Sequence, residues 1–216
     1  CCYKILSIDP NHFDSISMLA TLSAINGNFD KAVELLRKAI EIEPKNTVAI
    51  NNLGTAYQKL GQLKEAVNYY QKVLQINPKH TNANYNLGII FYKLSELKKA
   101  KSYLKKTTDI QNNYALAFFG LANVHVDLKE YNDAVSCYKK AIEINPNLAG
   151  AHNNLGLVFR ELNDFQNALS CYEKVIKINP NHSGTYHNSA LVYKELGKFD
   201  KAIKFHEIAI NYEPEN

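Results

Sequence analysis

The prolines of this sequence are spaced with a fixed period that governs the whole chain. Successive prolines stand 34 residues apart, or once 68 apart, and Asn112 occupies the place of the missing one. The series is Pro10, Pro44, Pro78, Pro146, Pro180 and Pro214. A fixed period of about 20 to 50 residues is typical of repeat proteins, in which each unit is one supersecondary element. We therefore expect an array of 34-residue units rather than one or two globular domains.

The units can be phased so that each begins three residues after the preceding proline. This divides the chain into six units, at 13–46, 47–80, 81–114, 115–148, 149–182 and 183–216, with 1–12 as the second-helix remnant of a preceding unit. The eighth and twentieth places are small in every unit: Ala20, Gly54, Gly88, Ala122, Gly156 and Ala190, then Ala32, Ala66, Ala100, Ala134, Ala168 and Ala202. Small side chains at matching heights let two helices approach to about 8–10 Å, so each unit is predicted to be a tight helical hairpin.

Both halves of a unit carry apolar residues at helical spacing. In 47–80 the first half has them at Ala49, Leu53, Ala56 and Leu60, and the second half at Leu63, Ala66, Val67, Tyr70, Val73 and Leu74. This spacing of three and four favours amphipathic helices with one buried stripe each. The proline that follows cannot donate a backbone hydrogen bond and restricts the residue before it, so it ends the second helix. The predicted fold class is all-α, built from antiparallel helix pairs.

The pattern resembles the tetratricopeptide repeat family, whose period is also about 34 residues. Asn-Asn-Leu-Gly at 51–54 and 153–156, together with Ala66, Tyr70 and Pro78, carries the match. The resemblance implies a right-handed α-solenoid, a superhelix whose first helices line a concave groove. In this family that groove is the usual surface for a protein or peptide ligand.

Both ends of the sequence look incomplete for a solenoid. The last unit has no polar helix after it, although such a helix usually covers the end of a repeat array. We expect a fragment of a longer protein, and the uncovered ends could associate with each other.

The sixth place of each unit holds the candidate binding residues. Helical spacing puts the second, sixth, ninth and thirteenth places on the groove side, opposite the buried stripe. In four of the six units this place is an asparagine: Asn52, Asn86, Asn154 and Asn188. Three further asparagines stand nearby in the sequence, Asn51, Asn123 and Asn153. An amide both donates and accepts, so a row of amides about 10 Å apart could hold the backbone of an extended peptide. The alternative is that these amides form only solvated or inter-repeat hydrogen bonds.

Charged residues of both signs accompany this row. The basic ones are Lys59, Lys93, Arg160 and Lys194, and the acidic ones are Asp14, Asp127, Glu161 and Glu195. With a net charge of only +4, such a mixture favours specificity at the rim or plain solvation over a nucleic-acid track. The fifth places carry no lysine or arginine, so no carboxylate clamp for chaperone tails is expected.

Two functional hypotheses follow. The first is a protein–protein interaction scaffold that binds an extended peptide or partner protein in the groove. The second rests on a further resemblance, to the repeat arm of O-linked N-acetylglucosamine transferases, which hold substrate chains with such asparagines. A catalytic domain would then lie outside this sequence, and Gly120 interrupts the asparagine row.

The unit at 81–114 departs most from the pattern. Lys101, Thr107, Thr108 and Asn112 replace apolar residues or proline found in the other units. Less apolar burial predicts that residues 98–113 are the softest part of the array.

No catalytic, metal or cofactor site is predicted. The seven histidines form no i, i+4 pair and adjoin no carboxylate cluster in the sequence. Cys1, Cys2, Cys137 and Cys171 form no CxxC, which favours reduced thiols in the cytoplasm or nucleus. No apolar run is long enough to predict a membrane span, and no secretory signal opens the sequence.

Overall fold

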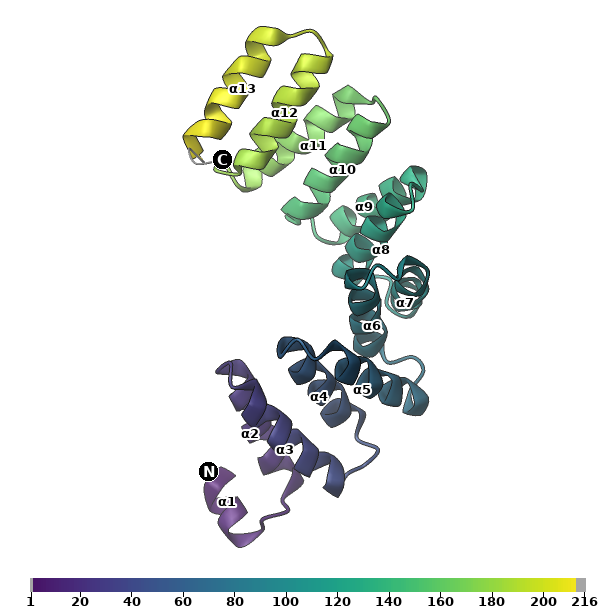
Figure 1. The fold of residues 1–216 in the computed structure, drawn as a ribbon, viewed down its shortest axis with the longest axis vertical. Coiled ribbons are helices and arrows are strands. Elements are labelled where there is room, and N and C mark those ends of the chain that lie inside the picture. Colours follow the sequence, from purple (N-terminus) through teal and green to yellow (C-terminus); the bar gives the residue numbers. More distant parts are fainter. Residues whose placement is uncertain (1, 213–216) are drawn as a thin grey trace. The chain divides into compact units, whose positions relative to one another are not determined.

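The computed structural model describes residues 2–212, which form thirteen α-helices and no strand. The helices are α1 (Cys2–Ile8), α2 (Phe13–Ile25), α3 (Phe29–Ile42), α4 (Thr47–Lys59), α5 (Leu63–Ile76), α6 (Thr81–Lys93), α7 (Leu97–Ile110), α8 (Ala115–Asp127), α9 (Tyr131–Ile144), α10 (Ala149–Glu161), α11 (Phe165–Ile178), α12 (Ser183–Glu195) and α13 (Phe199–Tyr212) (Figure 1). The chain divides into two compact units, Cys1–Glu96 and Leu97–Asn216. The division falls between the two helices expected for the repeat at 81–114.

In the first unit, successive helices form antiparallel hairpins that stack. Helices α2 and α3 make one hairpin and α4 and α5 the next, while α3 packs on α4 and α5 packs on α6 (Figure 1). The short helix α1 packs on α2. Each helix of the unit therefore contacts its neighbours in sequence, as expected for a repeat array.

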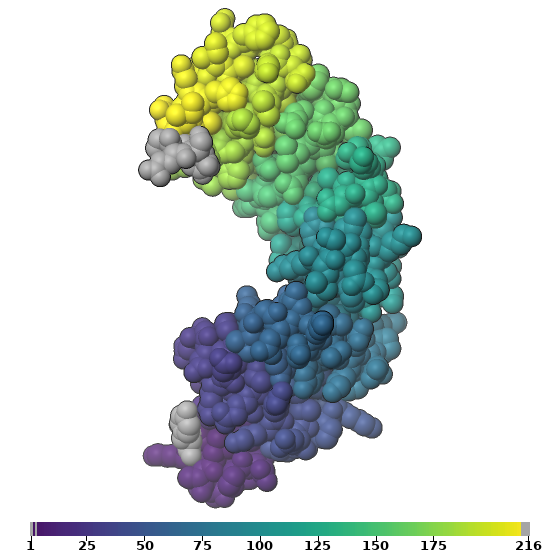
Figure 2. All heavy atoms as spheres, in the orientation of Figure 1, coloured from purple at the N-terminus to yellow at the C-terminus, as the bar shows by residue number. Residues whose placement is uncertain are grey.

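The second unit contains three complete hairpins, α8–α9, α10–α11 and α12–α13. Helix α7 packs on α8, α9 packs on α10, and α11 packs on α12, so residue numbers advance layer by layer through the unit (Figure 2). The first helices also touch one another, because α10 contacts both α8 and α12. This places the sixth-place residues of α10 and α12 on adjacent helices.

At two of the eighth places, Gly54 and Gly156, a tyrosine ring of the second helix packs against the small residue. Tyr70 and Tyr172 are fully buried, and a Cβ atom at Gly54 or Gly156 would lie 2.9 or 2.5 Å from the nearest ring carbon of the respective tyrosine. Real Cβ atoms do not approach other atoms so closely. Glycine at these two places is thus what lets the first helix reach the second.

The turn between the two helices of each repeat contains one residue with a positive φ angle. Three repeats place glycine there, at Gly27, Gly61 and Gly197. The other three place Ser95, Lys129 and Asn163 there, with φ angles of 59°, 60° and 59°. The left-handed conformation is costly for residues with a Cβ atom, so the fold imposes it at this position.

Four of the first helices, α2, α4, α6 and α12, begin at side-chain caps that the sequence did not lead us to expect. Nδ1 of His12, His80 and His182 accepts the backbone N–H of Ser15, Ala83 and Thr185 respectively. At the equivalent place in the second repeat, Oδ1 of Asn46 accepts the N–H of Ala49 across 3.1 Å. A histidine with an unprotonated Nδ1 thus takes the place of the usual asparagine.

The divergent repeat still contains a complete second helix, α7. Thr107 is fully buried there, and its hydroxyl donates to the carbonyl of Tyr103 across 2.9 Å. Thr108 satisfies its hydroxyl in the same way, on the carbonyl of Lys105. The two threonines therefore bury no unsatisfied donor, and the softness of residues 98–113 stays a prediction. Within residues 2–212, no helix is both long and apolar enough to cross a bilayer.

Candidate binding surface

The asparagines of the sixth place all lie on first helices, where each is half-buried. Asn52 is on α4, Asn86 on α6, Asn154 on α10 and Asn188 on α12. Of the three neighbouring asparagines, Asn123 on α8 and Asn153 on α10 are half-buried and Asn51 on α4 is buried. What each amide can bind depends on which hydrogen bonds it already makes, and these differ along the chain.

In the first unit, a hollow of about 400 Å³ lies between α2 and α4. Its lining is mainly apolar, from Ala20, Ala24, Ile25, Phe29, Leu36 and Ala56, with polar groups from Thr21, Asn52, Thr55 and Lys59. Ile25 is 75% exposed although it is a large apolar side chain. The hollow therefore combines an uncovered apolar surface with a few hydrogen-bonding groups, which is the usual composition of a ligand site.

The amide of Asn52 faces this hollow and makes no side-chain hydrogen bond to any other described residue. Both its donor and its acceptor are therefore available to a ligand. Lys59, further along α4, is exposed at the same hollow. Asn51 differs, because it is 8% exposed and its buried Oδ1 has no hydrogen-bond partner within the described residues.

Asn86 is engaged with the core of the preceding repeat. Its amide lies close enough to the Tyr70 hydroxyl to favour the ionised phenol, and this hydroxyl contacts Thr55 Oγ1 at 3.0 Å and donates to Gln58 Oε1 across 2.9 Å. Burial raises the pKa of Tyr70 to about 12, against the effect of these hydrogen bonds, so the phenol stays neutral. Asn86 thus lies beside the buried tyrosine of the preceding repeat.

In the second unit the amides form a continuous chain across three first helices. Asn188 donates to Asn153 Oδ1 across 3.4 Å, Asn153 donates to Asn154 Oδ1 across 3.2 Å, and Asn154 donates to Asn123 Oδ1 across 3.1 Å. The hydroxyl of Tyr138 also donates to Asn123 Oδ1, across 2.6 Å. We call Asn123, Asn153, Asn154 and Asn188 the amide chain.

The amide chain is the inter-repeat arrangement that the sequence left open as the alternative. Both hydrogen-bonding atoms of Asn154 are used inside the protein. Among the described residues, no hydrogen bond engages Nδ2 of Asn123 or Oδ1 of Asn188, so these two atoms remain for a ligand. The expected row of equivalent amides therefore separates into a free amide, Asn52, and a set that is largely paired.

The basic residues predicted for the groove differ in exposure. Lys93 and Lys194 are exposed, and Arg160 is half-buried with its Nη2 3.6 Å from Glu161 Oε1. A second hollow, of about 370 Å³, lies between α10 and α12 and is lined by Arg160, Glu161, Asn163, Phe165, Leu191 and Glu195. Its charged rim is of mixed sign, which does not favour a polyanion.

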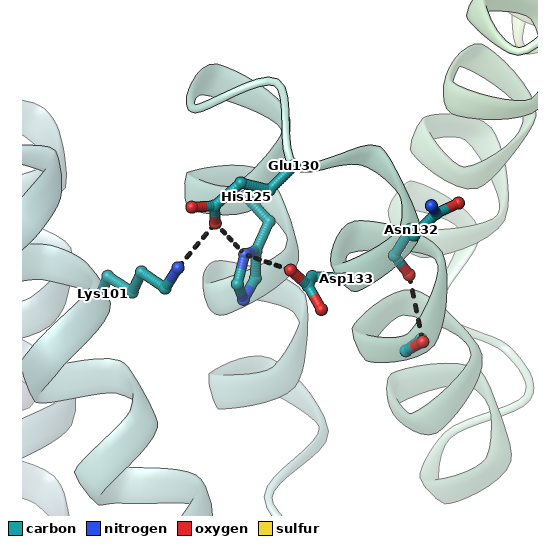
Figure 3. A network of polar contacts seen from close by, with 6 residues as sticks. Lys101, His125, Glu130, Asn132 and Asp133 are labelled. Carbon is teal, nitrogen blue, oxygen red and sulfur yellow. Dashed lines mark hydrogen bonds and ion pairs between the residues drawn. The ribbon is translucent and has the colours of Figure 1, made fainter.

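One polar cluster was missed by the sequence reasoning, and there the expectation that no histidine adjoins a carboxylate cluster is wrong. His125 at the end of α8, Glu130 and Asp133 come together at the α8–α9 turn, and Lys101 of α7 reaches Glu130 (Figure 3). The distance from His125 Nδ1 to Glu130 Oε2 is 2.6 Å. A search for i, i+4 pairs within one helix cannot find residues that a reversing turn brings together.

Known proteins were compared with the chain by sequence and by structure. Four models, described as TPR repeat or tetratricopeptide repeat, match residues 24–61 and 122–160, 48–80 and 149–182, 171–204, and 81–114. No curated protein sequence is significantly similar to this chain.

Solved structures of similar fold are numerous. A crystal structure of MamA is 27% identical, covers 76% of this chain and 95% of its own, and has a TM-score of 0.73. YrrB, described as a TPR protein with an unusual peptide-binding site, is 24% identical with a TM-score of 0.76, covering 86% of this chain and 95% of its own. PilF of Pseudomonas aeruginosa is 19% identical with a TM-score of 0.82, covering 94% and 93%. With the helix pairs and their 34-residue period, the matches to the four repeat models show that the chain belongs to the tetratricopeptide repeat family.

Proposed function

We propose that this chain is a scaffold that binds an extended segment of a partner protein along its first helices. The observation that carries the proposal is the hollow between α2 and α4, in which the free amide of Asn52 stands beside uncovered apolar side chains. Within this proposal the hollow is the anchor point. The chain itself is assigned no catalytic step.

The lining of the hollow indicates what kind of segment would fit. Ala20, Ala24 and Ala56 leave room at its base, while Ile25 and Phe29 add larger apolar surface. An apolar side chain of the partner would gain about 25 cal/mol for each Å² of apolar surface it buries there. A leucine-sized or phenylalanine-sized side chain is therefore the expected anchor.

The polar groups of the hollow would act on the backbone and the charge of the segment. Asn52 can donate to one carbonyl and accept from one N–H, which recognises a peptide backbone without regard to its side chains. Lys59 is the only charged group among the residues that line the hollow, so it favours an acidic residue next to the apolar anchor. The expected ligand is an extended segment with an apolar residue flanked by an acidic one.

The remaining groove residues have a smaller part in the proposal. Nδ2 of Asn123 and Oδ1 of Asn188 are available on α8 and α12, whereas Asn154 mainly holds its neighbours. We also propose that Lys93, Arg160 and Lys194 tune the charge preference. The printed description of YrrB as having a peptide-binding site supports this kind of ligand by analogy. None of the three structures named above is described as a glycosyltransferase. The alternative, that the chain is the substrate-binding repeat arm of such an enzyme, stays a prediction without support.

The test is a selection of binding peptides from a random display library, followed by titration of several unrelated selected peptides. Asn52→Ala is expected to weaken all of them by a similar factor, because it removes contacts to backbone. The single variant Ala24→Leu is expected to weaken binding of the same peptides more than Asn52→Ala does, because the larger side chain fills the hollow. The matched control is Asn68→Ala, which changes an exposed asparagine of the second helix α5 and should leave binding unchanged.

Two results would overturn the proposal. One is the selection of peptides whose affinities are the same for Ala24→Leu and the unmodified chain. The other is that Asn68→Ala weakens binding as much as Asn52→Ala does. Far-UV circular dichroism of each variant shows whether the helices are retained.

A further inference from the structure

The cluster at the α8–α9 turn places three groups that can bind a metal ion within reach of one point. One ligand atom each from His125, Glu130 and Asp133 lies within 4.8 Å of the other two. The side chain of His125 is only 9% exposed, and its Nδ1 faces both carboxylates, at 2.6 Å from Glu130 Oε2 and 4.0 Å from Asp133 Oδ2. The cluster shares no residue with the hollow between α2 and α4.

We propose that His125, Glu130 and Asp133 form a binding site for one divalent transition-metal ion, with Zn²⁺ as the preferred ion. An imidazole nitrogen and two carboxylate oxygens are ligands that Zn²⁺ accepts. Two carboxylates and a neutral imidazole also balance the charge of a divalent cation. With three protein ligands, the fourth coordination position is open to water, as the 68% exposure of the Asp133 side chain allows.

The distances in the cluster are close to those that the ion requires. Ligand atoms about 2.0–2.1 Å from a tetrahedral zinc ion lie about 3.3 Å from one another. The Glu130 oxygen must therefore move away from Nδ1 by less than an ångström, and the Asp133 oxygen must approach Nδ1 by a similar amount. The two carboxylate oxygens, which lie within 4.8 Å of each other, must come to the same separation. Both carboxylates are on side chains free to adjust, because Glu130 is 36% exposed and Asp133 more so.

Lys101 shows that this place already attracts a cation. Its ammonium nitrogen lies 2.6 Å from the same Oε2 atom of Glu130 that faces His125 (Figure 3). The Lys101 side chain is 34% exposed, so it can withdraw into solvent when a metal ion takes its place. Lysine and metal would therefore compete for Glu130, and this competition separates a metal site from a purely structural ion pair.

Cys137 stands one helical turn after Asp133 but is not part of the proposed ligand set. Burial, and next the charge of Asp133, raise the pKa of the Cys137 thiol to about 11. The thiol is therefore protonated at neutral pH, in which form it is a poor ligand.

The test is a calorimetric titration of the chain with ZnCl₂, in a background where Cys1 and Cys2 are serine so that adjacent thiols do not compete. One saturable site per chain is expected. His125→Gln should weaken Zn²⁺ binding at least about tenfold, since losing even an outer-sphere partner costs that much. Asp133→Asn, at an exposed position, should weaken it by at least the same factor. Lys101→Met should strengthen binding, because it removes the competing cation.

Two controls address other sources of metal binding. His187 and His206 form a neighbouring pair, with ring centroids 5.0 Å apart, and His187→Asn is expected to leave the zinc affinity unchanged. Cys137→Ser should also leave it unchanged, and the Co²⁺-loaded chain should show no cobalt–thiolate charge-transfer band. Circular dichroism of every variant confirms that the helices are retained.

The proposal is overturned if Asp133→Asn, folded as judged by circular dichroism, binds Zn²⁺ as tightly as the parent chain. It is equally overturned if His187→Asn removes the binding, or if Lys101→Met weakens it. A strong thiolate band would assign the metal to cysteine and reject this ligand set.

Discussion

Asn154 donates from Nδ2 to Oδ1 of Asn123 across 3.1 Å and thereby links the first helices of two consecutive repeats. Asn52 occupies the same sixth place of its own repeat, and its amide bonds to no other residue in the described part of the chain. Equivalent positions in the sequence therefore have different roles, one structural and one available to a ligand.

Replacing Asn154 by alanine is expected to destabilise the fold, whereas the same change at Asn52 is not. Asn154→Ala removes two hydrogen bonds and leaves the Asn153 donor unpaired, which should cost about 1–2 kcal/mol. Asn52→Ala breaks no internal bond and should stay within about 0.5 kcal/mol of the parent. Urea unfolding measures both. Equal losses for the two variants would show that Asn154 is no more structural than Asn52.

Removing the hydroxyl should lower the free energy of unfolding for one of two equivalent tyrosines, Tyr138, but not for the other, Tyr172. Tyr138 donates to Asn123, but the buried hydroxyl of Tyr172 has no hydrogen-bond partner within the described residues, since Leu157 stands where the other repeat has Asn123. Tyr138→Phe should lose about 1 kcal/mol, and Tyr172→Phe should be neutral or stabilising. Leu157→Asn is expected to give the Tyr172 hydroxyl a hydrogen-bond partner, so that Tyr172→Phe would then become destabilising in the Leu157→Asn background. Thermal unfolding of these variants measures the changes, and a large loss of stability for Tyr172→Phe in the parent chain would contradict the prediction.

Gly156 should not tolerate even the smallest side chain. Its Cβ atom would lie 2.5 Å from Cε1 of Tyr172, so Gly156→Ala forces the ring to move and should cost about 1–3 kcal/mol. The first repeat pairs Ala20 with Leu36 at the same two places. Adding Tyr172→Leu to Gly156→Ala should therefore recover part of the loss. A double variant no more stable than Gly156→Ala alone would argue against the ring contact as the cause.

The His80 cap should make stability depend on pH. Burial, only partly opposed by its own backbone hydrogen bond, holds the pKa of His80 below its ordinary value of 6.5. The cap therefore contributes fully above about pH 6.5, and its contribution is lost as pH falls through the lowered pKa, because protonated Nδ1 cannot accept the Ala83 N–H. The loss should be about 1 kcal/mol.

The control for the cap is His80→Asn, a change suggested by Asn46, which accepts an N–H at the equivalent place. Stability measured by urea unfolding at about pH 8 and about pH 5 should fall less for His80→Asn than for the parent chain. Because His12 and His182 cap other helices, the comparison with the parent isolates His80. An identical pH dependence in both chains would contradict the prediction.

Much of the fold could be predicted from the proline period and the small columns, because they report contacts that every repeat must make. The pairing of helices within a repeat is of this kind, whereas the positive-φ position between the helices, at Gly61 and its equivalents, was found only in the structure. Which partner an asparagine takes could not be predicted, because it depends on the residue at the ninth place of a neighbouring repeat. Thr55, Asn123 and Leu157 differ there, and so do the bonds around them. The His125 cluster was missed because His125 lies on α8, Glu130 in the turn that follows and Asp133 on α9.

The amide chain of the second unit has a direction. Each of Asn188, Asn153 and Asn154 gives its hydrogen to the next amide toward α8, and Tyr138 fixes the last acceptor. Turning over Asn153 or Asn154 alone would set oxygen against oxygen on one side and nitrogen against nitrogen on the other. We therefore expect the amides to keep one common orientation across three repeats, so that a ligand that reorients one of them would change the hydrogen bonds of the next.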